Sequence, residues 1–135
     1  LSGNWRNGKM LAARCNMCHQ VSNKVGIDFG PKFLTKWAKG QSKSAVIDAI
    51  VNPSSGISLG FDGTEVKLKN GATIQGILIE DGKYLKIKAI GGQILTIPSA
   101  EIKARKVLKT SLMMSASQMG MSAQNVADLT AYLKK

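Results

Sequence analysis

The sequence predicts a mainly α fold that is interrupted by an inserted antiparallel β-sheet or small barrel, α+β overall. Three observations support this expectation. Apolar residues recur at helical spacing near both ends of the chain, β-branched residues and turn pairs fill residues 61–108, and no internal repeat divides the sequence. The chain has 135 residues, about one ordinary domain, so we expect one domain over 1–135 with a β-rich subdomain inserted at 61–108.

Helices are expected on both sides of the β-rich segment. A short helix over residues 4–15 leads into a pair of cysteines. A second helix is capped by Ser42 or Ser44 and ends at Pro53, because proline cannot continue a helix. A third begins after Ser122, where apolar residues return at helical spacing. We expect these helical parts to pack together.

The β-rich segment is divided by turn signals. They stand at Asn70-Gly71, Asp81-Gly82 and Gly91-Gly92, and such pairs supply the positive φ angles of tight hairpins. Residues 84–90 alternate between apolar and polar side chains, as in a strand with one buried face. Gly76 indicates a bend or bulge within a strand. We therefore expect four or five antiparallel strands here.

The chain is strongly basic. It holds 19 Lys and Arg against 8 Asp and Glu, a formal charge of +11, which points either to an acidic partner or to a solvated lysine-rich face. The lysines form no compact block interleaved with aromatics, so no nucleic-acid partner is expected. No apolar run is long enough for a membrane span, and the first ten residues lack the apolar region of a signal peptide.

The stretch RCNMCHQ, residues 14–20, contains both cysteines and the only histidine of the chain. A structural zinc site usually takes four ligands from two Cys/His pairs, and this chain has one such cluster. A C-x-x-C redox dithiol belongs on a βαβ scaffold, which the sequence lacks, and a disulfide across two residues would be strained. Haem attachment explains all three residues, because C-x-x-C-H is the c-type signature.

In that arrangement, Cys15 and Cys18 bind one haem c through thioethers, and His19 binds its iron. A haem would also fill part of the core, which suits a chain with only 5% aromatic residues. Because haem c is attached outside the cytoplasm in bacteria, we expect a periplasmic or otherwise extracytoplasmic location.

The second iron ligand is open at this point. The chain has no second histidine, and methionine is the usual partner in electron-transfer cytochromes. Met10 lies in the first helix, and Met17 lies inside the C-x-x-C turn, too close to cross to the other face of the haem. Four methionines lie in the loop before the last helix, and we expect one to be a ligand and the rest to pack beside the haem: Met113, Met114, Met119 and Met121.

The order of these motifs resembles that of class I c-type cytochromes, and most closely the planctomycete and verrucomicrobial haem-binding domain with a β-rich insert. The shared motifs are GKMLAARCNMCH, the Gly-Pro at 30–31, IVNPSSGIS at 50–58, LKNGATIQGIL at 68–78, SLMM at 111–114 and DLTAYL at 128–133. The resemblance covers nearly the whole chain and implies a mainly α, class I-like cytochrome c fold. It implies Met113 as the iron ligand, with Met114 as the alternative because it stands where the family has proline.

The resemblance implies further site residues. The carbonyl of Pro31 or of its neighbour would orient the His19 ring, although Gly30-Pro31 would equally serve as a plain turn. The Trp37 indole would donate to a haem propionate, or else pack as an ordinary core side chain. Gly8 would let the first and last helices cross closely.

Electron transfer is therefore the expected function, with no enzymatic activity of the chain's own. Iron with histidine and methionine ligands moves only an electron, and the lysines would steer a redox partner with an acidic surface, for which a periplasmic dehydrogenase is the expected candidate. The alternative is a haem enzyme or gas sensor with a labile sixth ligand, against which the lack of a spare histidine counts. The inserted sheet would dock a partner domain, bind nucleic acid like other small barrels, or merely cover the haem.

Overall fold

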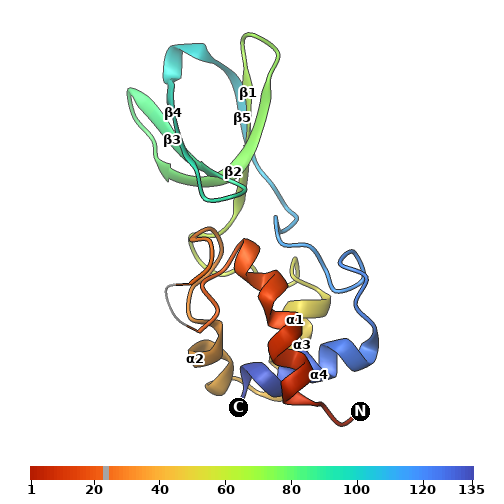
Figure 1. The fold of residues 1–135 in the computed structure, drawn as a ribbon. Helices are drawn as coiled ribbons and strands as arrows, with labels where there is room; N and C mark the ends of the chain where they lie inside the picture. The colour runs from red at the N-terminus through yellow and green to blue at the C-terminus, as the bar shows by residue number, and fades with distance from the viewer. Residues whose placement is uncertain (23–24) are drawn as a thin grey trace.

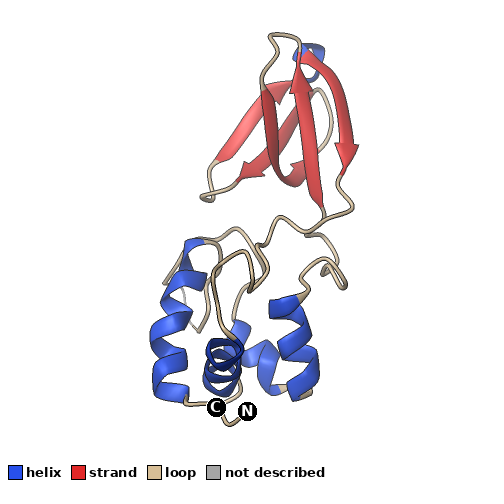
Figure 2. Ribbon diagram, turned by 90° about the vertical axis from the view of Figure 1, so that its right-hand side faces the viewer, coloured by secondary structure: helices blue, strands red, loops and turns tan. Residues whose placement is uncertain are grey.

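The structure, a computed structural model, describes residues 1–22 and 25–135. It has two parts: a curved sheet of five strands at one end and a group of short helices at the other (Figure 1). Both termini lie at the helical end, so the chain passes into the sheet and back again (Figure 2). Gly26, Gly30 and Pro31 predict a loop over residues 20–33, and this segment includes residues 23–24, which lie outside the described residues.

The prediction of a mainly α, class I-like cytochrome c fold is wrong. Helix makes up only 32% of the structure, the longest described helix has 11 residues, and a five-stranded antiparallel sheet makes the fold α+β. The expected helices form but are short, and the physical reason is that glycine, proline and serine keep the segments between them from becoming helical. Much of the described chain over residues 18–22, 25–33, 52–62 and 108–122 therefore runs as turns and irregular backbone.

The helical end consists of short segments with side-chain caps. In the described chain they are α1 (Trp5–Ala12), η1 (Ala13–Met17, a 3-10 helix), α2 (Leu34–Lys39), α3 (Lys43–Val51) and α4 (Ala123–Leu133). The side chains of Asn4, Ser42 and Ser122 accept backbone N–H groups at the starts of α1, α3 and α4. No sequence signal marks α2, which begins after Phe33, a residue with left-handed backbone at φ 56° and no capping side chain.

Helices α1 and α4 cross closely at Gly8. A Cβ on Gly8 would lie 1.9 Å from the Asp128 carbonyl oxygen, so only glycine permits this approach. The buried Asp128 carboxylate accepts hydrogen bonds from three neutral donors: Asn4 N at 2.7 Å, Asn7 Nδ2 at 2.7 Å and Gln124 Nε2 at 2.8 Å. These donors, the Asn4 N–H first among them, hold the pKa of Asp128 below its usual value. The start of the chain is thereby tied to its last helix.

The sheet is an antiparallel meander whose last strand returns to pair with the first. Its strands are β1 (Gly63–Leu68), β2 (Thr73–Glu80), β3 (Tyr84–Ala89), β4 (Ile94–Pro98) and β5 (Ile102–Val107), in the order β4-β3-β2-β1-β5. A 3-10 turn, η2 (Ser99–Glu101), carries the chain from one edge strand to the other. All five strands fall within the predicted β-rich segment.

The turns and faces of the sheet agree in most places with those predicted from the sequence. Gly71, Gly91 and Gly92 have positive φ angles, whereas Gly82 does not. The register shift of β2 lies between Leu78 and Glu80 and not at Gly76. Alternation buries one side of the sheet around a core of four residues: Val66, Leu85, Ile87 and Ile97.

Candidate functional site

Cys15 and Cys18 lie on one tight turn after α1. The Cys15 carbonyl accepts hydrogen bonds from the N–H groups of Cys18 at 3.1 Å and of His19 at 2.8 Å. Both thiols are free, and burial raises the pKa of each, with the neighbouring Cys18 adding to the effect on Cys15. Both are therefore protonated at neutral pH. Within the described part of the chain, no three His, Cys, Asp or Glu side chains converge to hold a metal ion.

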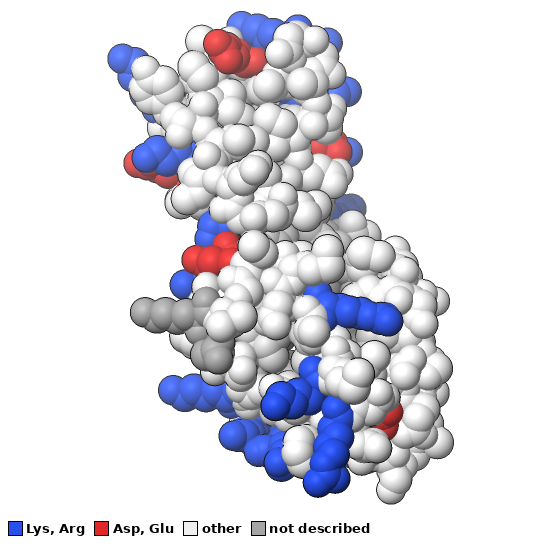
Figure 3. Space-filling model, viewed as in Figure 1, with Lys and Arg blue, Asp and Glu red and all other residues white. Residues whose placement is uncertain are grey.

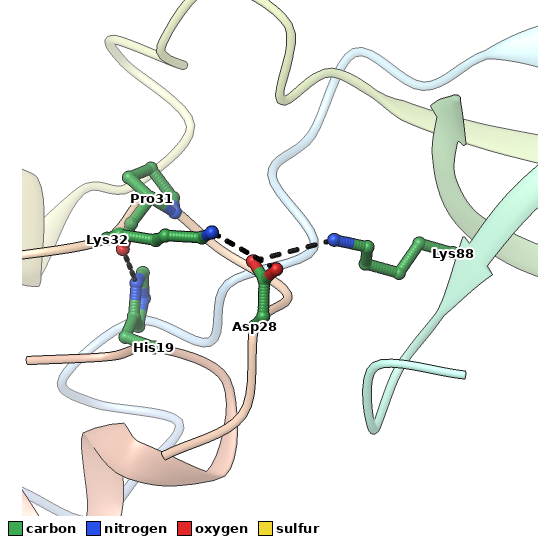
Figure 4. Close-up of polar contacts among 5 residues, drawn as sticks. All are labelled: His19, Asp28, Pro31, Lys32 and Lys88. Carbon is green, nitrogen blue, oxygen red and sulfur yellow. Dashed lines mark hydrogen bonds and ion pairs between the residues drawn. The ribbon is translucent and has the colours of Figure 1, made fainter. Parts of the chain in front are cut away.

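The His19 ring is buried, and one hydrogen bond fixes its tautomer. Its Nδ1 lies 2.7 Å from the Pro31 carbonyl oxygen (Figure 4). Because a carbonyl only accepts, Nδ1 carries the proton and Nε2 keeps its lone pair. Burial lowers the pKa of His19 and the contact with Pro31 opposes this only in part, so the ring is neutral at neutral pH. A neutral imidazole with a free Nε2 is the form that binds a metal.

Gly30 lets the following loop pass directly over the His19 ring. A Cβ on Gly30 would lie 2.5 Å from Cε1 and 2.8 Å from Nδ1 of that ring. The loop is itself fixed to the cysteine turn, because the N–H groups of Phe29 and Gly30 donate to the Cys18 carbonyl at 3.2 Å and 2.6 Å. The histidine is therefore held between the turn that carries it and a loop bonded to that turn.

The methionine loop, residues 109–121, is fastened to the end of α3. Met113 is half-buried, whereas Met114 is 52% exposed. The Met113 N–H donates to Ser111 Oγ at 3.0 Å, and the Ser111 N–H donates to Ser54 Oγ at 2.9 Å. Beyond the two methionines, the loop is bonded again to the last turn of α3 through its backbone. The two methionines therefore lie between two hydrogen bonds that tie the loop to the end of α3.

The remaining candidates differ in burial. Met10 and Met17 are 76% and 71% exposed, and Met121 packs against the helical core. Trp37 lies on α2 and is 40% exposed.

Sequence reasoning missed Asp28 and Ser54. Asp28 lies in the loop beside His19 and forms ion pairs with Lys32 at 3.2 Å and with Lys88 of β3 at 3.5 Å (Figure 4). Burial opposes ionisation there, but the two lysines together lower the pKa of Asp28. The sequence signals for Asp28 and Ser54 are weak: one acidic residue in a basic loop, and one serine after a helix-ending proline.

Positive charge is concentrated on the helical part. Residues 61–108 hold eight Lys or Arg and five Asp or Glu, whereas the rest of the chain holds eleven and three. Within the sheet, Glu80, Asp81 and Glu65 each pair with a lysine or arginine. Figure 3 shows the unbalanced basic side chains gathered at the helical end. No helix of the described chain is both long and apolar enough to cross a bilayer.

Comparison with models of protein families found no match to this chain, and comparison with curated proteins found none either.

Proposed function

We propose that the chain is an electron carrier that binds one haem c covalently through Cys15 and Cys18, with His19 as an iron ligand. The observation that carries this proposal is the state of His19. Its ring follows the second cysteine directly, is neutral, and has its Nδ1 proton engaged by Pro31 at 2.7 Å, which leaves Nε2 as a ligand.

The residues around the cysteine turn fit a large apolar group. Both thiols are free and carried by one turn, as two thioether bonds to a single macrocycle require. Three apolar side chains of the following segment keep more than a third of their surface exposed: Ile27 at 37%, Phe33 at 40% and Trp37 at 40%. A bound haem would give such side chains an apolar partner. Trp37 would bind a haem propionate, as an alternative to plain packing.

We propose Met113 as the second iron ligand, in preference to Met114. Its half-buried side chain and the hydrogen bond that holds its N–H support this choice, because the exposed Met114 lacks both. The haem supplies a one-electron couple at its iron, and a neutral thioether ligand favours the ferrous state. The chain's own residues position the histidine ligand: Pro31 keeps the proton on Nδ1, and Gly30 leaves space for the ring.

The proposed partner is a redox protein with an acidic surface, and a periplasmic dehydrogenase has the required chemistry. Excess positive charge on the helical part supports this, since opposite charge raises association rates and the effect falls with salt. The proposed location is periplasmic or otherwise extracytoplasmic, where haem c is attached. The chain itself needs no catalytic group for such a role, so we propose a carrier and not an enzyme.

The test is expression of the chain with a bacterial export signal and haem-attachment machinery. We expect one haem that stays bound on a denaturing gel, and a ferric spectrum with the weak far-red band of methionine-ligated haem. Cys15→Ser together with Cys18→Ser is the control and should abolish covalent attachment. If the chain, expressed with the haem-attachment machinery, carried no haem, the proposal would be wrong. Ready binding of carbon monoxide by the ferrous protein would favour a haem enzyme or gas sensor with a labile sixth ligand.

A further inference from the structure

The helical part and the sheet have separate cores. The helical core is built on residues of α1, α2, α3 and α4 and of two loops, whereas the core of the sheet is built on strand residues alone, and the two share no residue. Helices pack mainly on helices and strands pair with strands. Where the sheet stands relative to the candidate site therefore depends on the chain connections and on a small number of direct contacts.

One such contact reaches the loop that holds His19. Lys88 Nζ, on the outer side of β3, lies 3.5 Å from Asp28 Oδ1, while Lys32 Nζ lies 3.2 Å from Asp28 Oδ2 (Figure 4). A second contact lies at the next hairpin, where a Cβ on Gly92 would be 2.8 Å from Ile27 Cγ2. The sheet therefore touches two consecutive loop residues, Ile27 and Asp28.

These two residues stand between the hydrogen bonds that fix the loop to the cysteine turn. The Ile27 N–H donates to the Asn16 carbonyl at 2.8 Å, and the Phe29 N–H donates to the Cys18 carbonyl at 3.2 Å. Three residues after Asp28, the Pro31 carbonyl accepts the His19 Nδ1 proton. A displacement of Asp28 would therefore move the Pro31 carbonyl that orients the histidine ring, because a short, hydrogen-bonded stretch of backbone connects the two residues.

Lys88 is suited to act on this loop. Its side chain is only 19% exposed, so its stem is packed and its position is restricted. Lys86 on the same strand makes the corresponding contact inside the sheet, with Glu80 at 3.4 Å, and its side chain is 45% exposed. The two lysines share a strand and a face, but only Lys88 connects the sheet to the histidine loop.

We propose that the sheet positions the iron-ligand side of the site through the Lys88–Asp28 ion pair, so that Lys88 is a positioning residue for His19. The idea rests on the proposed function, and it assigns the sheet a role that needs no partner protein. An ion pair with one side chain largely buried restricts the loop 27–31.

The experiment compares Lys88→Met with Lys86→Met in the haem-loaded protein. We expect the amide hydrogens of Phe29 and Gly30 to exchange roughly two- to fivefold faster in Lys88→Met, the range expected from losing one partly exposed ion pair. The His19 Nδ1 proton resonance and the reduction potential should shift in the same variant. Lys86→Met should change none of these, and Lys88→Arg should restore them.

Other outcomes are decisive as well. Equal effects of Lys88→Met and Lys86→Met would mean that Lys88 only stabilises the sheet, and unchanged exchange in both would overturn the positioning role. Asp28→Asn gives a second approach: combined with Lys88→Met it should add little to either single change, because both remove the same contact. Absence of covalent haem would end the proposed function but leave the exchange measurement on Phe29 and Gly30 valid, so the two ideas fail separately.

Discussion

The two sides of the candidate haem site are held in different ways. On the histidine side, the ring of His19 is bonded to Pro31 and lies against Gly30. On the methionine side, Met113 is held through its main chain, by a relay from Ser111 to Ser54. One proposed ligand is positioned at its ring, and the other through its backbone N–H. We therefore expect the methionine side to loosen first.

Gly30→Ala should have the largest effect, because it disturbs the histidine side of the candidate site. The new methyl group would lie 2.5 Å from the His19 ring, so either the ring or the loop must move. Overpacking of this kind costs about 1–3 kcal/mol, and we expect the free energy of unfolding to fall by that amount. The haem-loaded variant should also lose its low-spin, histidine-ligated spectrum.

Gly40→Ala is the matched control for this substitution. A Cβ on Gly40 would have its nearest neighbour at 3.5 Å, an ordinary contact, and the backbone there is right-handed. Denaturant unfolding and spectra of Gly40→Ala should match those of the unchanged protein. If Gly30→Ala also matched, the ring would not be held as described.

Met113→Ala and Met114→Ala test the other side. Met113→Ala should abolish the far-red methionine band and lower the reduction potential, because the haem iron would lose its proposed thioether ligand. Met114→Ala should keep the band and change the free energy of unfolding by less than about 0.5 kcal/mol, as for most exposed substitutions. Loss of the band in Met114→Ala alone would exchange the two assignments.

Ser54→Ala weakens the methionine side without touching either ligand. It removes the acceptor of the Ser111 N–H, a hydrogen bond worth about 1 kcal/mol. On heating, the methionine band should disappear at a lower temperature than in the unchanged protein, while covalent attachment and the histidine spectrum persist. Ser117→Ala, at an exposed serine of the same loop, should leave the band's temperature dependence unchanged. If the methionine band and the histidine spectrum of Ser54→Ala disappeared together on heating, the two sides of the site would not differ in how firmly they are held.

The difference between the two sides also explains what the sequence could predict. Cys15, Cys18 and His19 form a local motif, so spacing alone makes them candidates, and paired turn residues locate the sheet. Met113 and Met114 are neighbours in sequence, and their unequal burial and the hydrogen bond on the Met113 N–H separate them.

Contacts between residues far apart in the chain leave no comparable pattern in the sequence. Lys88 and Asp28 meet only because the sheet folds back over the loop, and neither residue belongs to a pattern that spacing identifies. The wrong fold class has a different cause. Apolar spacing indicated where three of the helices form, but glycine, proline and serine keep the segments between the helices irregular, so the share of helix is small.

Thr130→Val should have the smallest effect, and it tests whether α4 supports both sides alike. Thr130 is 1% exposed, and among the described residues its Oγ1 has no hydrogen-bond partner. Valine has nearly the same shape and leaves no polar atom unpaired, so the free energy of unfolding should stay level or rise by up to about 1 kcal/mol. Because α4 packs against α1, α2 and α3, this change should alter neither the histidine spectrum nor the methionine band. A change in one of them alone, measured beside the unfolding midpoint, would show that α4 supports that side directly and that the site's asymmetry extends into the helical core.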